Sequence, residues 1–125
     1  MAERLIRIGR VSSVNPKNGM VSVTYPELDD STTVDLAVFS FTDEYKMPGI
    51  GQEVLVLHLS NGQTAGIVMG RIWNLRNVPQ NAGGSVFRKE LGQSYGEAYI
   101  EYNGSDMILK DRNAGEIRLS QIQLK

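Results

Sequence analysis

The sequence contains no cysteine and a single histidine, His58. Without cysteine the chain can form no disulfide framework, no thiolate metal site and no cysteine nucleophile. Long hydrophobic runs are missing too, because no segment approaches the roughly 20 apolar residues that a membrane-spanning helix requires. Residues 1–10 contain no apolar core of signal-peptide length. We therefore expect the protein to be made and assembled in a cytoplasm.

An excess of basic residues is also absent. Thirteen lysines and arginines stand against fourteen acidic residues, which gives a formal net charge of -1. Proteins that bind nucleic acids commonly carry a basic surplus, because neutralising phosphates drives their affinity. The composition therefore argues against nucleic acid as a partner.

Short apolar segments rich in β-branched residues alternate with turn sequences, and helical periodicity is scarce. Asn18-Gly19 and Asn61-Gly62 are dipeptides typical of hairpin turns. In the N-terminal part, strands are predicted over residues 6–14, 20–25, 33–41, 52–59 and 64–73. Five short strands joined largely by hairpins predict a closed barrel of the oligonucleotide/oligosaccharide-binding (OB) type, occupying residues 1–75. The fold class is thus all-β.

Two features of these strands carry further expectations. Gly9 interrupts the alternation of the first strand, as a bulge or a tight bend would, and Gly66 and Gly70 lie where a small barrel must bend. The strand over 52–59 is apolar on both faces and is predicted to be buried on both. One face carries Val54, Val56 and His58, and the other carries Leu55, Leu57 and Leu59.

A change of composition follows the barrel. Residues 76–84 are rich in Asn, Pro, Gln and Gly and are predicted to form a linker. Residues 85–125 contain only short predicted strands, over 85–89, 98–102, 107–110 and 116–121. Tyr99, Ile108 and Ile117 recur at a spacing of nine residues, a weak repeat of strand and turn of the kind found in β-helices.

About 40 residues of such strands cannot form a core alone, since a solitary β-ribbon is marginal in water. Three copies wound about one axis would cover the apolar side chains of this segment. The residues predicted to form this trimer core are Ile100, Tyr102, Met107, Ile108, Leu109, Ile117, Leu119 and Ile122. Ile108 and Ile117 are expected to point to the same side, toward the axis.

Three segments follow one another in an order and at a spacing seen in a known family. They are Ile8-Gly9-Arg10-Val11 leading to Gly19-Met20-Val21-Ser22-Val23, then Pro48-Gly49-Ile50-Gly51-Gln52-Glu53-Val54-Leu55-Val56, then Gly66-Ile67-Val68-Met69-Gly70. With them the chain resembles the phage baseplate assembly protein V family, the central spike of contractile phage tails and tail-like bacteriocins. Residues 5–75 carry the motifs of this resemblance, whereas residues 85–122 share only the general pattern of short strands and turns.

The resemblance implies a homotrimer with an N-terminal OB-fold and a short C-terminal β-helix or β-prism needle. It implies a structural part of the baseplate of a virion or tail-like particle, which docks beneath a trimeric hub protein of the tail tube and pierces the target cell envelope. Related spikes often end in a His-x-His motif that binds iron at the apex. Residues 121–125 contain no histidine, so no apical metal is predicted and a separate spike-tip protein is left open as a partner.

Catalysis is not expected. His58 has no triad partner at a suggestive spacing, and the carboxylate pairs Asp29-Asp30 and Asp43-Glu44 lie in predicted loops, where they are solvated and not tuned for acid–base work. No glycine-rich loop precedes a predicted helix, as phosphate binding would require. We therefore predict no catalytic, cofactor-binding or metal-binding residues.

The alternative interpretation is an OB-type binding module for single-stranded nucleic acid or carbohydrate, in which aromatic side chains stack on bases or sugars. The aromatic residues of the predicted barrel are Tyr25, Phe39, Phe41, Tyr45 and Trp73, and no basic run accompanies them. The apolar strands of residues 85–125 discriminate between the two interpretations, because a simple binding barrel has no need of them.

Overall fold

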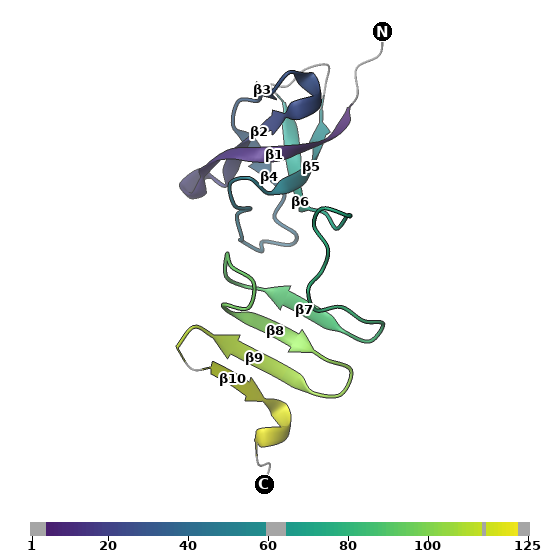
Figure 1. Cartoon of the computed structure of the whole chain (residues 1–125). Coiled ribbons are helices and arrows are strands. Elements are labelled where there is room, and N and C mark those ends of the chain that lie inside the picture. Colours follow the sequence, from purple (N-terminus) through teal and green to yellow (C-terminus); the bar gives the residue numbers. More distant parts are fainter. Residues whose placement is uncertain (1–4, 60–64, 114, 123–125) are drawn as a thin grey trace. The chain divides into compact units, whose positions relative to one another are not determined.

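A computed structural model describes residues 5–59, 65–113 and 115–122 of the chain. The chain folds as two units that divide between Asn77 and Val78 (Figure 1). Among the described residues, the helical segments are three short 3-10 turns, η1 (Pro16–Asn18), η2 (Pro26–Leu28) and η3 (Leu119–Gln121). The predicted all-β class is confirmed.

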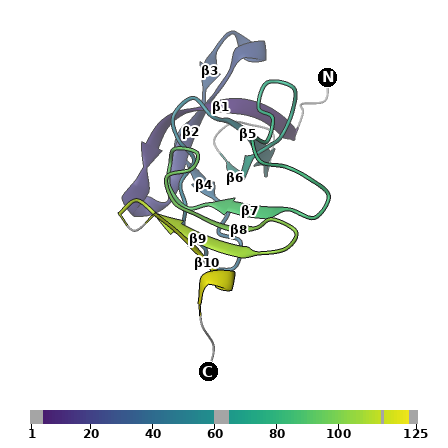
Figure 2. The same cartoon turned by 60° about the horizontal axis from the view of Figure 1, so that its bottom comes forward.

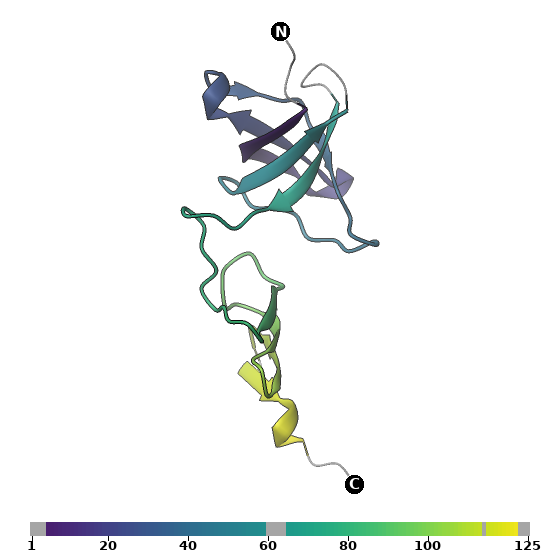
Figure 3. The ribbon, with the colours of Figure 1, turned by 90° about the vertical axis from the view of Figure 1, so that its right-hand side faces the viewer.

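The N-terminal unit is a closed five-stranded barrel, as predicted (Figure 3). Its strands are β1 (Ile6–Asn15), β2 (Met20–Tyr25), β4 (Leu36–Val38), β5 (Glu53–His58) and β6 (Gly66–Arg71). They pair in the order β1-β5-β6-β4-β2, and β2 closes the barrel on β1. The β4–β6 pair is parallel and the other pairs are antiparallel. A two-residue strand, β3 (Ser31–Thr32), pairs with β2.

The barrel core is formed by the inward-facing side chains of these strands and one loop residue. Its buried members are Val11, Val21, Val23, Tyr25, Leu36, Met47, Val54, Val56 and Val68. In β5, Val54, Val56 and His58 are buried, whereas the leucines between them are only half-buried and Leu59 is 65% exposed. The prediction that this strand is buried on both faces is therefore wrong for the single chain.

Gly9 has a different role from the predicted bulge or bend. It pairs regularly with Val54, and the register shift of β1 lies further along, between Val11 and Ser13. A Cβ atom at Gly9 would lie 2.5 Å from a methyl group of Val23 and 2.7 Å from the ring of Tyr25. Real Cβ atoms do not make such contacts, so the glycine is required by close packing across the barrel.

The predicted strand over 33–41 is much shorter in the structure. Only β4 lies within it. Phe41, Thr42 and Asp43 have positive φ angles of 46°, 64° and 64°. Left-handed backbone cannot continue a strand, and it is rare for non-glycine residues, so the chain leaves the sheet before Phe41.

The C-terminal unit is a four-stranded antiparallel sheet in the order β10-β9-β8-β7, in which each strand lies beside the next one in the sequence (Figure 2). Its strands are β7 (Phe87–Glu90), β8 (Tyr99–Tyr102), β9 (Met107–Asp111) and β10 (Gly115–Arg118). The last predicted strand, over 116–121, ends early because Leu119–Gln121 forms η3. The single chain forms this open sheet, and a β-helix is not seen in the described residues.

Candidate interaction surface

The register of the C-terminal sheet determines which side chains share a face, because directly opposed residues of paired strands point to the same side. One row across the sheet consists of Lys89, Ile100, Leu109 and Ile117. The neighbouring row on the other face consists of Arg88, Glu101, Ile108 and Arg118. The two faces therefore differ in chemistry: one is largely apolar and the other is largely charged.

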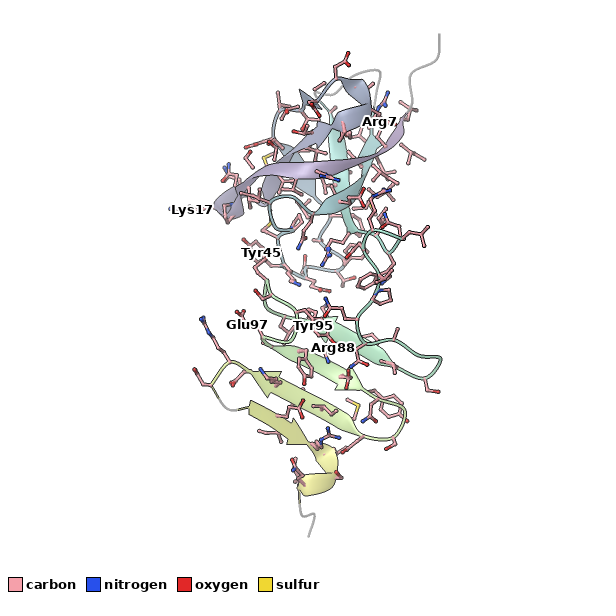
Figure 4. The ribbon with its side chains drawn as sticks, viewed as in Figure 1. Arg7, Lys17, Tyr45, Arg88, Tyr95 and Glu97 are labelled. Carbon is pink, nitrogen blue, oxygen red and sulfur yellow. The ribbon has the colours of Figure 1, made fainter. Side chains whose placement is uncertain are left out.

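On the charged face, Arg88 is the central residue. Its guanidinium donates a hydrogen bond of 3.0 Å to Glu101 and another to Glu90, and both Arg88 and Glu101 have side chains at most 10% exposed. The ring centroids of Tyr99 and Tyr95 lie 3.6 Å and 4.5 Å from the guanidinium carbon, and Figure 4 shows Tyr95 beside Arg88. Such contacts combine ion pairing with cation–π attraction.

The contacts on the charged face shift the pKa values of Arg88, Tyr99 and Glu116. Burial opposes the charge of Arg88, but the hydrogen bonds that it donates to Glu90 and Glu101, together with the negative charge of Glu90, outweigh burial and raise the guanidinium pKa. The Tyr99 hydroxyl donates to Glu116, which raises the pKa of Tyr99 and lowers the pKa of Glu116. Among the described residues no buried side-chain nitrogen or oxygen lacks a partner. The buried polar groups of the charged face are thus all paired and form a structural network.

Replacing Arg88 by methionine should strongly destabilise the C-terminal sheet, by about 3–5 kcal/mol, because it leaves the buried carboxylate of Glu101 without its ion-pair partner. The measurement is urea unfolding followed by circular dichroism. The matched control is Arg118→Met, since Arg118 lies in the same cross-strand row but is 40% exposed. It should cost less than about 1 kcal/mol. Equal losses in the two variants would contradict a special role for Arg88.

The other face of the sheet is apolar and uncovered in the single chain. Its apolar side chains are those of Phe87, Tyr102 and Met107 in one row and Ile100, Leu109 and Ile117 in the next, and Lys89 lies at the β7 end of the second row. Their exposed fractions reach 61% for Phe87, and Leu109 and Ile117 remain 53% and 47% exposed. We call these six residues the apolar face. A contiguous apolar surface of this kind marks an interaction site in a soluble protein.

Most of the predicted trimer-core residues lie on the apolar face, namely Ile100, Tyr102, Met107, Leu109 and Ile117. Ile108 does not: it pairs with Arg118 on the charged face and is only 2% exposed. The expectation that Ile108 and Ile117 point to the same side is therefore wrong.

Two further residues of the predicted trimer core lie beyond the strands. Leu119 lies in η3 and Ile122 follows it, and both are exposed. Phe87 also lies on the apolar face, but the predicted trimer core does not include it. Its position beside Arg88 in an alternating apolar and polar segment is a strand signal.

The single histidine lies inside the barrel. His58 Nδ1 is 3.3 Å from the carbonyl oxygen of Ala65, so this nitrogen carries the proton and donates. Nε2 then accepts a 2.6 Å hydrogen bond from the hydroxyl of Tyr25, which is fully buried. Both ring nitrogens are therefore occupied by structural hydrogen bonds, and the arrangement satisfies the polar atoms of two core side chains.

Burial raises the pKa of Tyr25 from 10.0 to about 12, against a smaller lowering by Arg7. The folded barrel therefore holds the neutral phenol at a pH where the unfolded chain already loses its proton. The free energy of unfolding should not be lowered by Tyr25 ionisation below pH 10, and it should fall by about 2 kcal/mol as the pH rises toward 12. Urea unfolding across this range tests the prediction. In Tyr25→Phe this part of the decline should vanish, and an unchanged slope would contradict the assignment.

The carboxylate pairs and the aromatic residues of the barrel do not gather into a site. Asp29 and Asp30 occupy a turn with positive φ angles, and no group of three or more potential metal ligands lies together in the described residues. Phe39 and Phe41 are exposed and contact each other edge to face, with ring centroids 4.6 Å apart. Tyr25 lies in the core, where it cannot stack on a base or a sugar.

Comparison with models of known protein families and with curated proteins gives no match for this chain. No helix among the described residues is long and apolar enough to cross a membrane. The fold and surfaces thus define an all-β protein with a closed OB-like barrel and a C-terminal sheet that leaves one apolar face open.

Proposed function

We propose that the chain is a structural part, the homotrimeric central spike of a contractile phage tail or tail-like particle. In this role the barrel docks beneath the trimeric hub protein of the tail tube, and the C-terminal sheets form a short needle that meets the target cell envelope. The observation that carries the proposal is the apolar face. The motif resemblance over residues 5–75 supplies the identity of the particle.

The apolar face favours a trimer by the following geometry. Three sheets placed around a threefold axis with their apolar faces inward enclose one common core, in the manner of a β-prism. In this arrangement Ile100, Leu109 and Ile117 point toward the axis, Lys89 lies at the β7 edge of the same row, and the charged face of each sheet points outward. Covering this surface supplies the hydrophobic stabilisation that four short strands lack alone.

The sheet edges offer a place for a further partner of the same assembly. In the described part of the chain, β7 pairs only with β8 and β10 only with β9, so each sheet presents two edges with unpaired backbone groups. Edges of this kind are sites for pairing with another chain. When the four strands of each sheet stack along the threefold axis, these edges lie at the two ends of the stub, and a separate tip protein can pair with one of them. The core shared by the three sheets gives a stub that resists bending and axial load.

The needle would be short. Neighbouring strands lie about 4.8 Å apart, so four strands stacked along the axis extend about 20 Å. A stub of this length provides a base for a separate tip protein. The charged outer face, which is paired within each chain, would remain compatible with water during delivery.

Immunogold electron microscopy of tail particles from the source cell tests the proposal. An antibody against the chain should label the distal end of the baseplate, and particles assembled with Ile117→Asp should lack that label and the ability to kill or infect. Labelling along the sheath, or normal activity of particles without the chain, would overturn the proposed function.

A further inference from the structure

The barrel carries a second apolar surface, on its outer side. Ile6 of β1 is opposite Leu57 of β5, which in turn is opposite Ile67 of β6, and Ile8 is opposite Leu55 in the next row. Leu59 follows on the same side of β5 by strand alternation. We call these six residues the outer stripe. Ile6 is 62% exposed and Leu59 is 65% exposed, whereas the outer face of a barrel of this kind is commonly polar.

At one end the outer stripe is bordered by charged residues. The next outward pair along the two strands is Arg10 and Glu53. Glu53 also binds Arg76 at 2.8 Å and Asn74 at 2.9 Å. An apolar centre bordered by a polar rim is the usual composition of a protein–protein interface.

The size of the outer stripe decides what can cover it. Its exposed apolar surface is on the order of 400 Å², within the range of functional patches on monomers, but only about half of the roughly 800 Å² that each partner of a stable complex contributes. A free partner would not remain bound to so small a surface. A partner that is already tethered nearby can remain bound, because tethering raises its effective concentration to about the millimolar range.

We infer that the outer stripe is a second interface between copies of this chain, at which three barrels pack around the threefold axis once their C-terminal sheets have trimerised. The inference rests on the proposed function for the tether. It explains why β5 is apolar on both faces: one face fills the barrel core and the other covers the neighbouring copy.

Cysteine cross-linking tests the inference, because the chain has no cysteine of its own. In the full chain, Ile8→Cys treated with a short bis-maleimide reagent should give covalently linked copies. Lys17→Cys, on the exposed turn η1 (Figure 4), is the control and should give several-fold fewer. A third variant combines Ile8→Cys with Ile117→Asp, which removes the tether, and cross-linking should fall to the control level.

The outcomes separate the two proposals. A trimeric full chain in which Ile8→Cys links no better than Lys17→Cys would overturn the second interface and leave the trimer intact. Strong linking that persists with Ile117→Asp would show that the barrels associate without the tether, against the argument from area. A monomeric full chain would overturn both.

Discussion

Replacing Ile117 by aspartate should convert the proposed trimer into monomers while the barrel remains folded. In the proposed prism this side chain lies near the threefold axis, so the change places three carboxylates in one small dry core, at a cost of roughly 3 kcal/mol or more for each. In the single chain Ile117 is 47% exposed, so the fold of one copy should tolerate the charge. Light scattering reports the mass, and circular dichroism reports the fold.

The control for this experiment is Arg112→Asp, which adds negative charge on an exposed turn next to β9. It should leave the mass of the assembly unchanged. A stable trimer carrying Ile117→Asp would show that the apolar face is not the trimer interface. Loss of the trimer in both variants would point to a general effect of net charge.

Replacing Gly9 by alanine should unfold or severely weaken the barrel, at a cost of about 3 kcal/mol or more. The added methyl group would lie 2.5 Å from Val23 and 2.8 Å from the backbone oxygen of Thr24. A side chain can rotate away, but a backbone carbonyl held in the β1–β2 ladder cannot. Urea unfolding followed by circular dichroism measures the loss.

Gly84→Ala provides the matched control, because a Cβ atom at Gly84 meets nothing within 4 Å and its φ is not positive. It should change stability by less than about 0.5 kcal/mol. If Gly9→Ala were as stable as this control, the close packing of β1 against β2 would be wrong.

The barrel could be predicted because its signals are local. Asn18-Gly19 marks the first hairpin, and Gly19 takes the left-handed conformation with φ of 67° that such turns need. The alternation of Val54 and Val56 identifies an inward face. The close packing that requires glycine at position 9 could not be predicted, because it depends on side chains that approach from another strand. The Tyr25–His58 hydrogen bond joins residues 33 positions apart and has no local signal.

The error over Ile108 and Ile117 has a definite cause. Two residues nine positions apart lie on the same face of the sheet when the β8–β9 hairpin joins their strands, and on opposite faces when the β9–β10 hairpin joins them. Tyr102 pairs with Met107, so four residues separate this pair, whereas Asp111 pairs with Gly115 and three residues separate them. An odd loop shifts the alternation by one, and a one-residue shift exchanges the faces of a strand. Loop length therefore decided which residues form the apolar face.

The mass of the full chain in solution tests the central claim most directly. Multi-angle light scattering at micromolar concentration should give a single species of three times 13.8 kDa, because the apolar face has no cover within its own sheet. A monodisperse species of 13.8 kDa under the same conditions would contradict the trimeric needle.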